Sequence, residues 1–176
     1  TNRREQGIGY TYDADGRLTS KYLPDGTVIT YTYDARGNLA STTDATGLTL
    51  YTFDQTTDRL SRITTSDGHW LAYTYCTCGR RTSLTDDSGY TLSYNYDPYG
   101  RLATLVDSDG VTQVNYAYDA NGKVARKTLG NGVFTDYVYD ADGNTLTVWN
   151  RFPDGGTLSR FDYTYDRRGL RTSMTT

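Results

Sequence analysis

The sequence predicts an all-β fold made of tandem β-hairpins, each about 21 residues long, that pair into one long antiparallel sheet. Two observations favour this class. A tyrosine–aspartate phrase returns eight times along the 176 residues, and a glycine-containing turn signal lies about halfway between successive copies. Turn signals spaced by roughly ten residues leave no room for a typical helix of about 11 residues.

The repeat is carried by the phrase Tyr-x-Tyr-Asp-x-x-Gly. Its second aromatic residue falls at positions 12, 33, 53, 75, 96, 118, 139 and 165, so the steps are 21, 20, 22, 21, 22, 21 and 26 residues. Two copies depart from the phrase, because Phe53-Asp54 has no glycine three places on and Cys76 stands where the aspartate is expected. The candidate structural residues are those of the other six copies: Tyr12, Asp13, Gly16, Tyr33, Asp34, Gly37, Tyr96, Asp97, Gly100, Tyr118, Asp119, Gly122, Tyr139, Asp140, Gly143, Tyr165, Asp166 and Gly169.

Each period holds two turn signals, and we expect their chemistry to differ. In Asp-x-x-Gly, the aspartate side chain accepts backbone hydrogen bonds and the glycine supplies the positive φ that closes the turn. The halfway dipeptides, such as Asp25-Gly26 and Asn131-Gly132, are strong hairpin signals. We therefore expect two-residue type I′ turns there, which need positive φ at both central residues.

The segments between turns are rich in Thr, Tyr, Val, Leu and Ile, which suit a pleated sheet. Alternation places Ile29, Tyr31 and Tyr33 on one face of their strand. The tyrosine pairs are expected to form an aromatic ladder from strand to strand. A twisted open sheet rarely exceeds ~10 strands without curling, so about 16 strands should coil into a spiral, a wide barrel or part of a shell.

Composition excludes several classes of protein. The chain carries 18 Lys+Arg against 21 Asp+Glu, a net charge of −3, which lacks the electrostatic footprint of a nucleic-acid-binding protein. No apolar run approaches the roughly 20 residues of a membrane helix, and no signal peptide is visible. We expect no cofactor, no nucleic-acid partner and no membrane span.

His69, Cys76 and Cys78 are the residues with the most reactive side chains. His69 with one of the cysteines would make a nucleophile–base pair, or the three would furnish part of a zinc site. The simpler interpretation is a surface histidine in a hairpin, with cysteines that are either free thiols or a strained oxidised pair. We therefore predict no catalytic residue and no metal ligand.

Three Asp-x-Asp strings resemble fragments of calcium-binding loops: Asp13/Asp15, Asp107/Asp109 and Asp140/Asp142. A complete loop also needs a distal bidentate acid at fixed spacing, and none follows. These aspartates are better explained as turn residues, with weak calcium binding at the sheet edge as the alternative.

The strings Tyr12-Asp13-Ala14-Asp15-Gly16-Arg17-Leu18 and Tyr96-Asp97-Pro98-Tyr99-Gly100-Arg101-Leu102 resemble the tyrosine–aspartate (YD) repeat of Rhs proteins. In that family, these repeats wind as a β-sheet spiral into a hollow shell, which in bacterial members encloses a C-terminal toxic domain. The resemblance covers essentially the whole chain. The family's closing Asp-Pro-x-Gly-Leu motif is not matched, because Arg101 replaces the leucine after Asp97-Pro98, so no self-cleavage site is implied.

The resemblance implies that residues 1–176 are a single array, cut from a larger shell, with a non-catalytic role in enclosing a toxin or other cargo. Its partners would be the rest of the shell polypeptide and the cargo, and its location would be secreted or at the bacterial cell surface. We also expect self-association through edge strands. The alternative function is an aromatic-rich module that binds carbohydrate or another cell-surface ligand through exposed rings.

Overall fold

The computed structural model describes residues 7–176, which form sixteen β-strands and no helix. The strands are hydrogen-bonded in chain order from β1 to β16 in one antiparallel sheet, which confirms the predicted all-β class with one hairpin per repeat. The chain divides into two compact units, residues 1–91 and residues 92–176. The array predicted over residues 1–176 also includes residues 1–6, which lie outside the described part of the chain.

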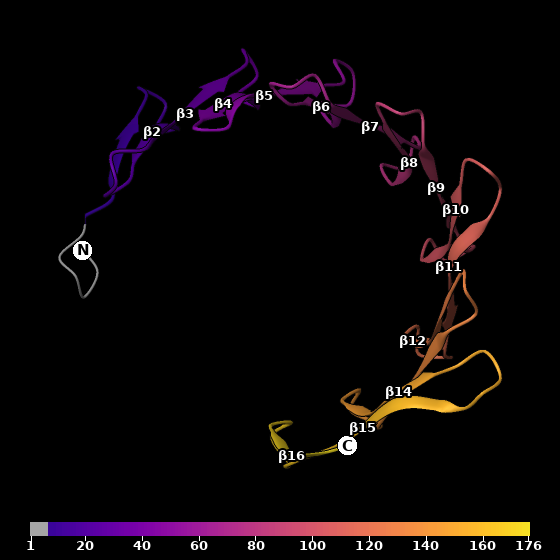
Figure 1. Cartoon of the computed structure of the whole chain (residues 1–176). Coiled ribbons are helices and arrows are strands. Elements are labelled where there is room, and N and C mark those ends of the chain that lie inside the picture. Colours follow the sequence, from indigo (N-terminus) through magenta and orange to yellow (C-terminus); the bar gives the residue numbers. More distant parts are fainter. Residues whose placement is uncertain (1–6) are drawn as a thin grey trace. The chain divides into compact units, whose positions relative to one another are not determined.

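In the first unit, successive hairpins lie side by side in a single layer (Figure 1). Its strands are β1 (Gly9–Tyr12), β2 (Leu18–Tyr22), β3 (Val28–Tyr33), β4 (Leu39–Asp44), β5 (Gly47–Phe53), β6 (Leu60–Thr64), β7 (Trp70–Tyr75) and β8 (Arg81–Asp86).

The second unit repeats this pattern. Its strands are β9 (Thr91–Tyr96), which starts at the boundary, β10 (Leu102–Asp107), β11 (Thr112–Tyr118), β12 (Val124–Leu129), β13 (Phe134–Tyr139), β14 (Thr145–Arg151), β15 (Thr157–Tyr165) and β16 (Arg171–Thr175).

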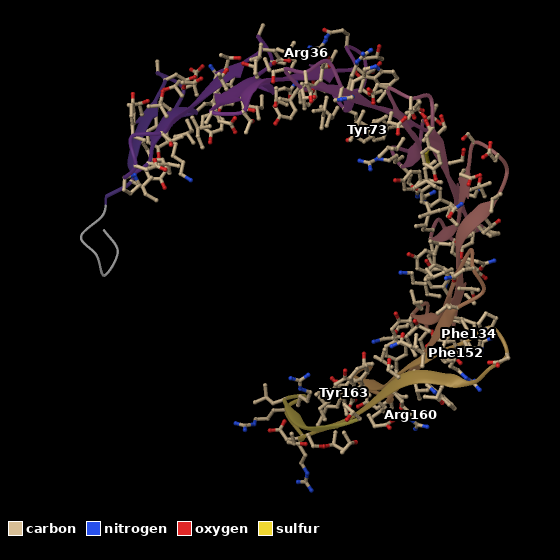
Figure 2. All side chains as sticks on the ribbon, viewed as in Figure 1. Arg36, Tyr73, Phe134, Phe152, Arg160 and Tyr163 are labelled. Carbon is tan, nitrogen blue, oxygen red and sulfur yellow. A yellow bond between two sulfur atoms is a disulfide. The ribbon has the colours of Figure 1, made fainter. Side chains whose placement is uncertain are left out.

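The two faces of the sheet differ in chemistry. In β3, Ile29, Tyr31 and Tyr33 are half-buried and alternate with exposed residues, as the pleat predicts. The face opposite the tyrosines carries hydroxyl pairs, such as Thr32 with Ser41 at 2.6 Å between their oxygens. In the second unit, Figure 2 shows Tyr163 and Arg160 of β15 on opposite sides of the ribbon.

The predicted aromatic ladder is a mixed one. Tyr73 lies directly opposite Leu84, and Tyr137 lies opposite Val148, so tyrosines alternate with aliphatic side chains across neighbouring strands. Tyrosine rings against aliphatic side chains still make favourable cross-strand pairs.

A single-layer sheet has no enclosed core. Among the described residues, no hydrophobic side chain is buried, and Ser41, at 9% exposure, is the one buried polar residue. Stability therefore depends on the backbone ladder, on cross-strand pairs and on contacts between successive turns. The described residues also include no helix long and apolar enough to cross a bilayer.

The prediction of type I′ halfway turns is wrong. In the turn at Asp25-Gly26, the Gly26 N–H donates to the Leu23 carbonyl at 3.0 Å, and the Leu23 N–H donates to Thr27 at 2.8 Å. Only Gly26 has positive φ there, at 86°. This is a three-residue loop that ends in a left-handed glycine.

The tyrosine–aspartate turns use the same backbone pattern, so the expected difference between the two turn sets lies only in their side chains. The Gly16 N–H donates to the Asp13 carbonyl at 3.1 Å. This is the same backbone hydrogen bond as the one from Gly26 to Leu23 in the halfway turn. Gly-ending loops of this kind need one residue with positive φ, which explains why one glycine per turn suffices.

Candidate functional site

The tyrosine–aspartate turns contain the residues that recur most strictly, and the aspartate closes each turn. Asp97 Oδ1 accepts the backbone N–H groups of Tyr99 and Arg101, both at 2.9 Å. Its Oδ2 accepts the Arg101 Nε–H at 2.7 Å. One carboxylate therefore binds the second and fourth residues after it, while Gly100 takes φ of 79°.

The other consensus aspartates lie in equivalent turns. The pKa of the Asp13 carboxyl is lowered chiefly by the backbone N–H of Arg17. The pKa of Asp140 is lowered chiefly by the side chain of Asn144. The turns at Asp13 and Asp140 thus stabilise an anion at their first position. The carboxylates that bond the backbone N–H two and four residues on are Asp13, Asp34, Asp97, Asp119 and Asp166, and Asp140 bonds the backbone of Asn144.

A β-bulge follows every tyrosine–aspartate turn that has a described register. In the first repeat, Tyr12 pairs with Leu18 but Thr11 pairs with Ser20, so Thr19 is the extra residue. The pairing of β2 with β3 begins only at Ser20. The Leu18 carbonyl therefore lies beyond the ladder that joins this repeat to the next, and such a carbonyl needs another partner.

A tyrosine hydroxyl supplies that partner. The Tyr33 hydroxyl donates to the Leu18 carbonyl at 2.8 Å, and the Tyr118 hydroxyl donates to Leu102 at 2.7 Å. We call this bond the tyrosine tie: the second tyrosine of one repeat bonds the carbonyl two residues after the turn glycine of the repeat before it. The same bond joins Tyr75 to Leu60, Tyr139 to Val124 and Tyr165 to Thr145.

A cation from the preceding turn also covers the tied ring at Tyr33, Tyr75, Tyr118 and Tyr139. The Arg101 guanidinium lies 4.2 Å from the centre of the Tyr118 ring, and Lys123 Nζ lies 4.8 Å from that of Tyr139. Arg101 also pairs with the aspartate of its own turn. Burial of these rings raises the pKa of Tyr118 and of Tyr139, so both remain neutral donors at physiological pH.

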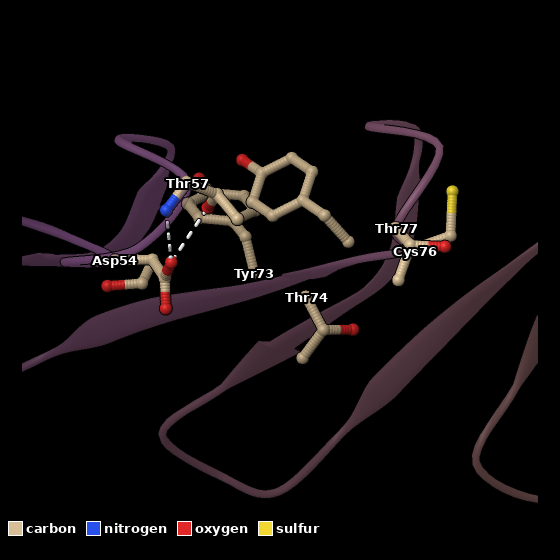
Figure 3. A pocket seen from close by; sticks show the side chains of 8 residues that line it. Asp54, Thr57, Tyr73, Thr74, Cys76 and Thr77 are labelled. Carbon is tan, nitrogen blue, oxygen red and sulfur yellow. Dashed lines mark hydrogen bonds between the residues drawn. The ribbon is translucent and has the colours of Figure 1, made fainter.

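The two copies that depart from the phrase keep the turn by other means. In the Asp54 copy the loop is one residue longer, and Asp58 takes the left-handed conformation with φ of 58°. The Asp54 carboxylate accepts the N–H and the hydroxyl of Thr57, at 2.7 and 2.8 Å (Figure 3). In the Cys76 copy, Cys76 and Cys78 form a disulfide.

The structure does not bring His69 to the cysteines. His69 lies in the halfway turn before β7 and Cys76 lies in the turn after it, so the two residues are at opposite ends of one strand. His69 Nδ1 instead makes a close ion pair with Asp87, which raises the pKa of the imidazole. Neither the nucleophile–base pair nor the partial zinc site is assembled by this geometry.

The Asp-x-Asp strings are used within their own turns. Asp13 bonds backbone N–H groups, and Asp15 Oδ2 pairs with Arg17 Nη2 at 2.8 Å. Asp107 Oδ1 accepts the N–H groups of Asp109 and Val111. Among residues 7–176, no group of three or more His, Cys, Asp or Glu is arranged to hold a metal ion.

Sequence reasoning missed two members of the site. The acceptor of the tyrosine hydroxyl is a backbone carbonyl, which carries no sequence signal. The covering cation does leave a signal, because a basic residue follows the turn glycine at Arg17, Arg101 and Lys123. That signal predicts a charge at the turn, but only the structure shows that it lies over the ring of the next repeat.

The chain belongs to the RHS repeat family. The family model matches more than half of the chain, over residues 12–49, 33–69, 79–112 and 118–149. No curated protein matches the sequence at a significant level.

Solved structures of toxin complexes share the fold. A crystal structure of TcdB2-TccC3-TEV aligns with a TM-score of 0.68 and 17% identity, over 95% of this chain and 11% of that one. The crystal structure of TcdB2-TccC3 gives 0.66 and 18%, over 95% and 11%. The Photorhabdus luminescens Tc holotoxin pore gives 0.60 and 18%, over 96% and 11%. The chain thus spans about a ninth of the length of these structures.

Proposed function

We propose that this chain is a non-catalytic segment of an Rhs-type wall that encloses a C-terminal toxic domain or other cargo. The carrying observation is the tyrosine tie, which joins a repeat to the turn edge of the repeat before it at Tyr33, Tyr75, Tyr118, Tyr139 and Tyr165. Without it, the bulges would leave the ladder open at every second turn. A wall that separates its contents from solvent needs the gaps that these bulges leave between neighbouring repeats to be closed.

The tie also explains how an array of this kind grows. A copy that has the tyrosine uses the carbonyl of its predecessor and offers one to its successor, so the same contact extends the sheet in both directions. Tyr12, in the first copy, is 60% exposed, and the equivalent carbonyl in the last copy belongs to Arg171. We propose that neighbouring repeats of a longer polypeptide bind at both places, and that the completed array coils into a shell.

A wall explains the consensus tyrosines better than a glycan-binding module does. A ring that stacks on a sugar needs a free face. The Tyr33 ring is covered by Arg17, whose guanidinium lies 5.1 Å from the ring centre, and its hydroxyl is bound to Leu18. The residues that recur are thus engaged within the array.

The test is limited proteolysis of the full polypeptide that contains this chain. We expect the segment that follows the array to resist protease until the array unfolds. The triple variant Tyr118→Phe, Tyr139→Phe and Tyr165→Phe should expose that segment, while Tyr99→Phe, at a residue that is 82% exposed, serves as the matched control. A downstream segment that is cut equally fast before and after unfolding would contradict enclosure.

The isolated chain should associate through its edges. Every residue of β1 and of β16 is exposed, and both strands end the sheet among the described residues. Exposed edge strands pair readily with other strands. We expect light scattering to show a mass that rises with concentration, and a strict monomer at all concentrations would refute this proposal. The fold neighbours include toxin complexes, which supports our proposal of a secreted or cell-surface location.

A further inference from the structure

The Cys76–Cys78 disulfide replaces an aspartate-closed turn. The pair lies between β7 and β8, at the first and third positions of a tyrosine–aspartate turn. In the regular turn at Asp97, the carboxylate binds the N–H groups two and four residues on. Here the Arg80 N–H, four residues on, donates to Cys76 Sγ at 3.3 Å, and the link to the third position is the covalent bond itself.

The first position of this turn is built to hold a negative charge. In every regular copy the aspartate there accepts the backbone N–H four residues on, and the pKa of Asp13 is lowered chiefly by the Arg17 N–H. The Arg80 N–H takes the same place opposite Cys76. A thiolate at Cys76 would therefore have the hydrogen-bond donor that a carboxylate has in the sister turns, and such donors favour the anionic form of cysteine.

The second sulfur is the accessible one. Cys78 is exposed and Cys76 is half-buried. The Arg80 guanidinium lies near the bond, with Nη1 at 3.8 Å from Cys78 Sγ. In Figure 3 the sulfur of Cys76 projects to the side away from Asp54 and Thr57. An incoming thiolate thus reaches Cys78 from solvent, and the positive charge of Arg80 attracts it.

We propose that Cys76–Cys78 is a thiol–disulfide exchange site whose substrate is a thiol compound. The substrate thiolate attacks Cys78 Sγ and forms a new S–S bond there. The Cys76–Cys78 bond breaks, and its electron pair leaves with Cys76, which becomes a thiolate held by the Arg80 N–H. Attack by a second thiol on the mixed disulfide releases the oxidised substrate and leaves two reduced cysteines, so the substrate is oxidised by two electrons and the protein is reduced by two.

The first experiment tests the exchange. The oxidised chain is incubated with reduced glutathione in one arm and with a peptide that contains a single cysteine in the other, then quenched with acid and analysed by mass spectrometry. We expect a mixed disulfide at Cys78. An adduct with glutathione alone identifies small thiols as the substrate, and an adduct with both includes protein thiols. No adduct in either arm overturns the proposal, as does an adduct mainly at Cys76.

The second experiment tests the stabilised leaving group. Alkylation by iodoacetamide is measured against pH for Cys78→Ser, which leaves Cys76, and for the matched control Cys76→Ser, which leaves Cys78. We expect the alkylation midpoint of Cys76 to lie about one pH unit or more below that of an ordinary thiol, near 8.5, and the midpoint of Cys78 to lie close to it. Equal midpoints overturn the assignment.

Two further measurements guard against loss of folding. Ultraviolet thiolate absorbance of the fully reduced wild-type chain gives the same titration without any substitution, and an unshifted curve there also overturns the proposal. In Arg80→Gln the backbone N–H is kept and the guanidinium is lost. We expect that variant to retain the low midpoint of Cys76 and to form the mixed disulfide more slowly. A midpoint that returns to the ordinary value would show that the side chain, and not the turn, stabilises the thiolate.

Discussion

The regular copy at Asp97 and the irregular copy at Asp54 are both linked to a neighbouring repeat at their turn edge, but by different residues. At Asp97 the loop ends in Gly100, and the carbonyl of Leu102, two residues after that glycine, accepts a hydrogen bond from the hydroxyl of Tyr118. In the Asp54 copy the second aromatic residue is Phe53, which has no hydroxyl and so forms no tie back to the preceding repeat, although the Leu60 carbonyl after this turn is itself tied to Tyr75.

A polar contact between turns takes the place of the missing tie. The longer loop carries Asp58, whose Oδ1 accepts the Asn38 Nδ2–H at 2.7 Å and lies 3.4 Å from Arg36 Nη1. Asn38 and Arg36 belong to the turn of the preceding repeat. The comparison teaches that successive turns are linked even where the tyrosine is absent, and that the tyrosine tie is the commonest form of the link. Four predictions sharpen the comparison.

Acid should have the largest effect, because it acts on regular and irregular turns together. The pKa of Asp13 is lowered by the Arg17 N–H, and that of Asp54 by the side chain of Thr57. A carboxyl whose pKa is lowered in the folded state contributes its full stabilisation of the fold at pH values above its unfolded pKa of about 4. That stabilisation is lost as the pH falls below this value and through the folded pKa. We expect the melting temperature to be level from neutral pH to about 5 and to fall steeply below about 4.

The matched variant for this prediction is Asp97→Asn. Its amide oxygen keeps the backbone hydrogen bonds but loses the charge pair with Arg101. We expect lower stability at neutral pH and a shallower loss in acid. A variant with the same acid profile as the wild type would contradict the role of this carboxylate.

Gly16→Val should have the next largest effect. Gly16 has φ of 78°, and no atom lies within 4 Å of a Cβ added there, so the cost is conformational and not steric crowding. We expect the free energy of unfolding in urea to fall by on the order of 2 kcal/mol. Gly16→Asn should cost less, because asparagine, like Asp58 in the irregular turn, tolerates this conformation. Equal losses for valine and asparagine would count against the turn assignment.

Tyr118→Phe should cost about 1 kcal/mol, because it removes the tie and leaves the Leu102 carbonyl without its donor. Urea unfolding is the measurement. Tyr99→Phe in the same copy is the control, since Tyr99 is 82% exposed, and its stability should be unchanged. If both variants match the wild type, the tie contributes nothing.

Phe53→Tyr should have the smallest effect and the opposite sign. The substitution restores a hydroxyl at the tie position. Its expected acceptor is the carbonyl of Leu39, the residue two places after Gly37. We expect a gain below about 1 kcal/mol, because the Asn38–Asp58 bond already links these turns. The double variant Phe53→Tyr, Asn38→Ala should regain most of what Asn38→Ala loses. Strictly additive effects would show that the two links are independent.

Much of this fold was predictable because it is local. A period near 21 residues with two glycine turns specifies hairpins, and the alternation in Ile29, Tyr31 and Tyr33 specifies a face. The turn type was not predictable from Asp25-Gly26, since the dipeptide suits both a type I′ turn and the end of a three-residue loop. The structure decides between them, because the Gly26 N–H donates to the carbonyl of Leu23, two residues before the dipeptide.

By itself, the sequence determined the class of fold, the number of strands, their order and the family, because each rests on short-range turn chemistry repeated eight times. Only the tertiary structure decided what the tyrosine does. A hydroxyl finds its acceptor on a carbonyl some fifteen residues earlier, and that carbonyl is free only because a bulge separates two strands there. Every residue carries a backbone carbonyl, so residue type does not indicate which carbonyl is the acceptor. Contacts of this kind are therefore seen only when neighbouring repeats lie side by side in the structure.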